Sequence, residues 1–148
     1  MTDIQEYTPI HPRMLARRIQ NILKTKSVVT VELCGDMGSG KSTLGMMAAH
    51  YILWPHTNEY TKLVSVLQLN RANKPRDIIR GLPLAFDQVV ILDEPGTGCE
   101  ALELWNGVLE HAKTNGVYGN RTVCMIMTLE PLLKCPDIRI SFAGEDKS

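Results

Sequence analysis

Eight residues in the first third of the chain have the types and spacing of a phosphate-binding loop. Gly35 to Ser42 reads GDMGSGKS and fits the pattern G-x-x-x-x-G-K-[ST] at every fixed position. The glycines allow backbone N–H groups to surround a phosphate, and the helix that follows presents its positive end to it. Lys41 adds a cation for the terminal phosphates, and Ser42 offers a hydroxyl to Mg²⁺. The sequence thus predicts a nucleoside triphosphate site with Mg²⁺, whose binding residues are Gly35, Asp36, Met37, Gly38, Ser39, Gly40, Lys41, Ser42 and Thr43.

Two adjacent carboxylates end the most apolar run of the chain. Val89 to Leu92 is continuously apolar, as expected of a central parallel strand that is covered on both faces. Asp93 and Glu94 follow it, at the edge where open α/β sheets bind ligands. We expect Asp93 to hold Mg²⁺, directly or through water, and Glu94 to activate a water molecule as general base. This pair facing a phosphate loop predicts hydrolysis of the terminal phosphate.

Strand-like and helix-like segments alternate along the chain and must position these groups. The alternation predicts a three-layer α/β/α sandwich with a mainly parallel sheet, in which the loop and the two carboxylates share one edge. Expected strands cover residues 28–34, 63–67, 89–92, 122–128 and 138–142; expected helices begin at Pro12 and Pro75 and cover 41–54 and 100–115, and residues 131–135 form a short helix or turn.

Length and charge restrict the function classes. The 148 residues suffice for one domain, 1–148, with residues 1–10 expected to form a loose arm. Sixteen basic and sixteen acidic side chains balance, so the whole molecule has no bulk attraction to nucleic acid or anionic membrane. The exception is a predicted amphipathic helix over residues 11–26, whose basic face serves either as a solvated surface or as a nucleic-acid contact; its basic residues are Arg13, Arg17, Arg18, Lys24 and Lys26.

Cysteine spacing and hydropathy point to a soluble cytoplasmic protein without a membrane partner. The four cysteines contain no C-x-x-C pair, which favours free thiols in a reducing compartment over disulfides or zinc. No apolar run approaches the roughly twenty residues that a membrane helix needs, and no signal-peptide pattern occurs.

The two motifs together resemble the Walker A and Walker B motifs of P-loop NTPases of the additional-strand, catalytic-glutamate class. That class includes ABC, AAA+, RecA-like and HerA/FtsK-like ATPases. The resemblance implies a RecA-like core, ATP and Mg²⁺ as cofactors, and catalytic roles for Lys41 and Glu94. It also implies that a polar residue ends the strand beside Walker B and senses the γ-phosphate, and Thr128 occupies the matching position.

Within this class, the region 28–142 resembles the compact HerA/FtsK-like and Zot-like ATPases of viruses and plasmids. Within this region only the two Walker motifs are specific. The L-S-G-G-Q signature of ABC subunits does not occur before the Walker B motif, which disfavours that family. The resemblance implies a motor ATPase that translocates or remodels DNA, in the host cytoplasm if the protein is viral. It further implies a homo-oligomeric ring in which a neighbour's arginine completes the site, with Arg121 and Arg139 as candidates.

Other functions fit parts of the pattern. The loop is similar to the G-D-L-G-A-G-K-T loop of TsaE, the small ATPase of tRNA threonylcarbamoylation. A nucleotide switch with little hydrolysis, acting on a protein partner, needs the loop and Mg²⁺ alone. A kinase for a small metabolite is disfavoured because Glu94 suits water activation. Preference for ATP over GTP rests on the class resemblance, although no guanine-reading N-K-x-D motif occurs.

Overall fold

The fold is built on a five-stranded sheet in which all strands are parallel. The structure, a computed structural model, describes residues 10–69, 73–93 and 99–142. Along the sheet the strand order is β4-β5-β6-β1-β7. The strands are β1 (Val28–Cys34), β4 (Val64–Leu67), β5 (Gln88–Asp93), β6 (Thr122–Thr128) and β7 (Ile138–Ser141).

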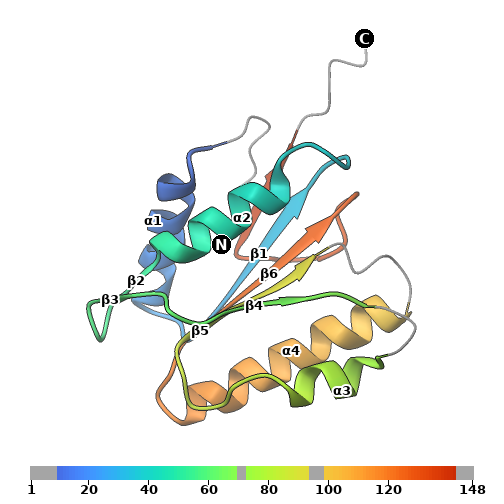
Figure 1. Cartoon of the computed structure of the whole chain (residues 1–148). Coiled ribbons are helices and arrows are strands. Elements are labelled where there is room, and N and C mark those ends of the chain that lie inside the picture. The colour runs from blue at the N-terminus through green and yellow to red at the C-terminus, as the bar shows by residue number, and fades with distance from the viewer. Residues whose placement is uncertain (1–9, 70–72, 94–98, 143–148) are drawn as a thin grey trace.

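Helices cover both faces of the sheet, as the sequence predicts for an α/β sandwich (Figure 1). The helices α1 (Pro12–Leu23) and α2 (Lys41–Tyr51) lie on one face. The helices α3 (Pro75–Arg80) and α4 (Cys99–Val117) lie on the other. Because the strands are all parallel, their carboxyl ends meet at a single edge of the sheet.

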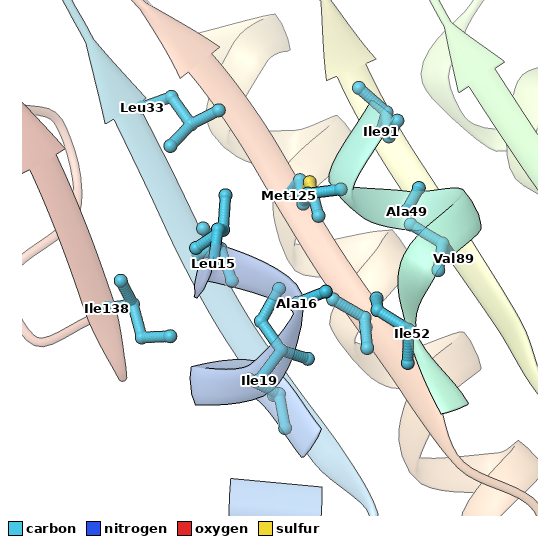
Figure 2. Packing of buried hydrophobic residues seen from close by; sticks show 14 of the residues in the cluster. Leu15, Ala16, Ile19, Leu33, Ala49, Ile52, Val89, Ile91, Met125 and Ile138 are labelled. Carbon is cyan, nitrogen blue, oxygen red and sulfur yellow. The ribbon is translucent and has the colours of Figure 1, made fainter. Parts of the chain in front are cut away.

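Alternate residues of each strand form the two halves of the core, as the period of two requires. In β6, Met125 packs toward α1 and α2, whereas Ile126 packs toward α4. Figure 2 shows the first half, where Leu15, Ala16 and Ile19 of α1 lie over the sheet between Ile138 of β7 and Ile52, which follows α2. The central strand β6 is buried at all seven positions, so it forms the middle of the core.

The N-terminal helix is amphipathic, as expected. Its buried residues are Leu15, Ala16, Ile19 and Leu23, which recur at helical spacing, and Pro12 occupies its first turn. The helix ends at Leu23, so Lys24 and Lys26 of the predicted basic segment follow it instead of belonging to it. No helix in the described part of the chain combines the length and apolarity that crossing a bilayer requires.

The helix predicted over residues 41–54 was too long by one turn. Helix α2 ends at Tyr51, and β2 (Leu53–Trp54) pairs antiparallel with β3 (Glu59–Tyr60). Pro55 explains the difference, because a proline disfavours helical geometry at the residue before it. The result is a small hairpin between α2 and β4 that the sequence pattern did not indicate.

Two further predicted boundaries differ from the structure. Gly116 was expected to end the long helix, but α4 continues through it to Val117. A Cβ at this glycine would lie 3.0 Å from Ser27 Oγ, so a close approach of α4 to the residue before β1 explains why glycine is present. Residues 131–135 form no helix and run as an irregular crossover into β7, which ends at Ser141.

Candidate active site

The predicted phosphate loop connects the end of β1 to the start of α2 at the carboxyl edge of the sheet. Gly38 and Gly40 have φ angles of 79° and 93°, a left-handed conformation that strongly favours glycine. Gly40 is the N-cap of α2, and no side chain caps the helix there. The first turn of α2 therefore offers backbone N–H groups and a positive dipole end to an anion.

Lys41 is folded over its own loop. Its Nζ donates to the carbonyl oxygens of Gly35 at 2.8 Å and of Asp36 at 3.2 Å, and the residue is only 2% exposed. These contacts hold the ammonium group inside the loop, next to the backbone that would surround a phosphate. The structure therefore places the Lys41 ammonium at the loop, and its contact with phosphates stays a prediction.

The buried hydroxyl of Ser39 in the loop can form hydrogen bonds that the described residues do not supply. Ser39 Oγ is shielded from solvent and has no hydrogen-bond partner within the described residues. Such a group is costly unless a ligand or water satisfies it. Its position between Gly38 and the start of α2 is consistent with a ligand that carries hydrogen-bonding oxygens.

The Walker-type serine and aspartate meet across 51 positions of sequence. Ser42 Oγ donates to Asp93 Oδ1 at 3.0 Å, from the first turn of α2 to the last residue of β5. Gln68 Nε2 donates to the other oxygen, Asp93 Oδ2, at 3.4 Å. Two predicted metal-binding side chains are therefore brought together, and a third polar residue orients the carboxylate.

The oxygens of Ser42 and Asp93 fit a Mg²⁺ site. Mg²⁺ takes oxygen ligands at about 2.0–2.1 Å in an octahedron, so that neighbouring ligand oxygens are about 2.9 Å apart. The observed separation of 3.0 Å is that of a hydrogen bond, and both atoms are oxygens of the kind that Mg²⁺ prefers. Among the described residues no group of three or more His, Cys, Asp or Glu side chains is arranged to hold a metal, but nucleotide-bound Mg²⁺ takes its other ligands from phosphates and water.

Thr128 lies at the expected edge, but its hydroxyl is engaged with a buried carboxylate. The carbonyl oxygen of Thr128 accepts from Gly35 N at 3.0 Å, which joins the end of β6 to the start of the loop. Its Oγ1 donates to Glu32 Oε2 at 3.1 Å and lies 3.4 Å from Cys34 Sγ. The residue therefore contacts the phosphate loop through its backbone, and its predicted sensor role stays a prediction.

Glu32 is the centre of a buried polar network on β1. It is fully buried and forms an ion pair with Arg139 of β7. The Nε of Arg139 donates to Oε1 of Glu32 at 3.0 Å. The backbone N–H groups of Leu132 and Leu133 also donate to it, at 2.6 Å and 3.3 Å. One carboxylate thus fastens the crossover from β6 to β7, directly beside the phosphate loop.

Arg121 and Arg139, the two candidates for completing a neighbouring subunit's site, lie in different surroundings. Arg139 is bound within its own chain by Glu32 and also donates to the Leu133 carbonyl, which argues against a role in a neighbour's site. Arg121 lies before the amino end of β6, the opposite edge from the loop, and its Nε donates to the Leu23 carbonyl. Glu94, the predicted general base, lies outside the described residues.

The cysteines of the sheet are not poised as nucleophiles. Burial raises the pKa of Cys34 above its ordinary value, and burial raises the pKa of Cys124 to about 12. Both thiols therefore stay protonated at neutral pH, and only thiolates react readily.

Two residues of the site were missed by sequence reasoning. Gln68 directly follows β4, so its place after a strand was the available signal. Glu32 is a charged residue inside the otherwise apolar run of β1, which is rare unless the charge is paired. A charged residue in a buried strand therefore predicts a buried partner of opposite charge.

Comparison with known protein families, with curated proteins and with solved structures finds no match to this chain.

Proposed function

We propose that this chain is a Mg²⁺-dependent ATPase of the P-loop type. The observation that carries the proposal is the 3.0 Å contact between Ser42 of the loop and Asp93 at the end of β5. The strand order also supports it, because β6 lies between β1 and β5. An additional strand between the strand of the loop and the strand of the aspartate is the feature for which the additional-strand class is named.

Each side chain has a separate task in this proposal. The loop backbone and Lys41 bind the phosphates, and Ser42 and Asp93 would hold Mg²⁺, which neutralises phosphate charge when bound. Glu94 accepts a proton from the attacking water as general base. Thr128 reports the presence of the γ-phosphate, and its bond to Glu32 would pass that signal to the crossover before β7.

We further propose that hydrolysis drives movement or remodelling of DNA. Support comes from the class resemblance of the loop and Asp93, and from the positive charge on the exposed side of α1. This helix exposes Arg13 and Arg17, has the partly buried Arg18 and contains no acidic residue. A ring of identical subunits belongs to the same proposal.

Phosphate release from ATP, measured with Mg²⁺ in wild-type and Glu94→Gln proteins, tests the hydrolytic role. We expect Glu94→Gln to lower kcat at least about 100-fold, the usual contribution of a general base, while binding of a fluorescent ATP analogue is retained. Glu130→Gln is the matched control, since Glu130 is an exposed carboxylate after β6. Hydrolysis by Glu94→Gln at the wild-type rate would remove Glu94 from its role.

The same assay with added polymers separates the related functions. Stimulation by DNA that disappears at high salt supports the motor role. Stimulation by tRNA instead favours the TsaE-like function. Nucleotide binding without turnover under every condition favours a nucleotide switch.

A further inference from the structure

A small open groove lies at the end of α2 that is remote from the phosphate loop. Helix α2 has 11 residues and is about 15 Å long, so its last residue, Tyr51, is well separated from Ser42. In Figure 1 the β2–β3 hairpin lies beside this end of α2 and beside α1. The groove, called here the Arg–Tyr groove, is lined by Arg13, Arg17, Gln20, Tyr51, Leu53 and Tyr60.

The groove contains two neighbouring positive charges. Arg13 and Arg17 are one helical turn apart on α1, and both are exposed. Within residues 10–69, 73–93 and 99–142, no acidic side chain forms an ion pair with either of them. Two neighbouring guanidinium groups without carboxylates suit phosphate oxygens, which they bind with charge-assisted hydrogen bonds.

Aromatic rings flank these charges. The guanidinium of Arg13 lies 4.7 Å from the ring centre of Tyr51, and the Tyr60 side chain is exposed on the hairpin. An exposed tyrosine ring beside arginines is the combination on which unpaired bases stack while their phosphates are neutralised. A duplex does not offer its base faces for such stacking.

The groove is too small to enclose a whole small-molecule ligand, and its size favours a single unit of a polymer as occupant. Its volume is about 180 Å³, below the roughly 300–1,000 Å³ of sites that enclose a small molecule. The groove is open to solvent, so a ligand bound there is not enclosed. We propose that the Arg–Tyr groove binds single-stranded nucleic acid, with Arg13 and Arg17 on phosphates and the ring of Tyr60 against a base.

The choice of nucleic acid as partner rests on the motor function proposed above. The two proposals are separable, because binding at the groove is measured without ATP. The Glu94→Gln protein should bind the strand as tightly as wild type, whatever the outcome of the hydrolysis assay.

Fluorescence anisotropy of a labelled oligo(dT) of about 20 nucleotides, titrated with full-length protein, tests the arginines. We expect Arg13→Ala/Arg17→Ala to bind roughly tenfold or more weakly, and the salt slope to fall by about 1.4, as for two lost phosphate contacts. The matched control is Arg76→Ala/Arg80→Ala, which removes the same charge from exposed positions on α3, across the sheet. Equal affinities of the two double variants would overturn the proposal.

Tyr60 provides a test that does not involve charge. Tyr60→Ala should bind oligo(dT) about 5-fold to 150-fold more weakly with an unchanged salt slope, and Tyr60→Phe should restore binding. Oligo(U) replaces oligo(dT) in a second arm, and binding of either polymer supports the proposal. Tighter binding of a duplex, or equal competition by polyglutamate, would overturn it. Unchanged thermal unfolding of each variant shows that a loss of binding is not a loss of fold.

Discussion

Ser42 and Asp93 are polar groups that meet at the end of two buried elements. The serine is in the first turn of α2, and the aspartate is the last residue of β5. Neither residue is specific by itself, since each is a common polar side chain. Their 3.0 Å contact turns two separate motifs into one candidate site.

Glu32 is the residue whose loss should cost the most stability. It is fully buried, and Glu32→Ala removes the carboxylate that pairs with Arg139 and accepts from the Thr128 hydroxyl and two backbone N–H groups. Breaking a buried ion pair from one side costs about 3–5 kcal/mol. We expect a decrease of this size in the free energy of unfolding, measured with urea.

Two further variants show whether the ion pair is the cause. Glu32→Leu/Arg139→Leu removes both charges and should recover part of the loss, because no buried charge remains unpaired. Lys26→Ala breaks the ion pair with Asp137, in which the lysine is half exposed, and should cost no more than about 1 kcal/mol. A double leucine variant as unstable as Glu32→Ala would show that the charge pairing is not what stabilises the crossover.

At the scale of elements, the close packing of α2 on the sheet positions the phosphate loop. Gly45 faces the sheet, and a Cβ there would lie 2.2 Å from Met127 Cε and 3.2 Å from Leu33 Cδ1. The absence of a side chain lets α2 approach β1 and β6. This approach in turn keeps Ser42, one turn earlier, within reach of Asp93.

Gly45→Val should therefore destabilise the protein despite the better helix propensity of valine. Overpacking of a core costs about 1–3 kcal/mol, and we expect a loss in this range in urea unfolding. His50→Val introduces the same residue at an exposed position of α2 and should stay within about 0.5 kcal/mol of wild type. Equal stabilities of the two variants would mean that α2 does not pack against the sheet as described.

At the scale of the whole molecule, nucleotide binding should stabilise the fold, because the site joins several elements. The loop follows β1, Asp93 ends β5, and Thr128 ends β6. A ligand held by the folded state alone adds about 2.7 kcal/mol at a concentration of 100 times Kd. For a chain of this length we expect Mg²⁺ and ATP to raise Tm by roughly 5–10 °C.

Differential scanning fluorimetry measures this shift in Tm. Two lysine variants distinguish stabilisation by binding at the loop from a general effect of added salt. Lys41→Ala should abolish most of the rise, whereas Lys113→Ala, an exposed lysine of α4, should retain it. Removal of Mg²⁺ with a chelator should lower the rise in wild type. The same increase in Lys41→Ala would indicate that ATP binds elsewhere.

Much of the secondary structure could be predicted because its signals are local. The apolar run of β6 predicts its bounds, Thr122–Thr128, and the helical spacing around Leu104 predicts α4. The loop pattern from Gly35 to Ser42 follows from residue types alone. Conformational preference and periodicity depend on near neighbours, so a single sequence carries them. The errors at Pro55 and Gly116 occurred where a turn or a close contact outweighed the periodic pattern.

The sequence by itself determined the glycine-rich loop pattern from Gly35 to Ser42, the apolar strands and the amphipathic helices, since each depends on residues adjacent in the chain. Only the tertiary structure decided that β6 lies between β1 and β5, that Glu32 pairs with Arg139, and that the hairpin joins α1 in a groove. These features depend on which distant segments pack together. No local preference encodes that choice, because it is made by burial of the whole core and by the pairing of groups that burial removes from water.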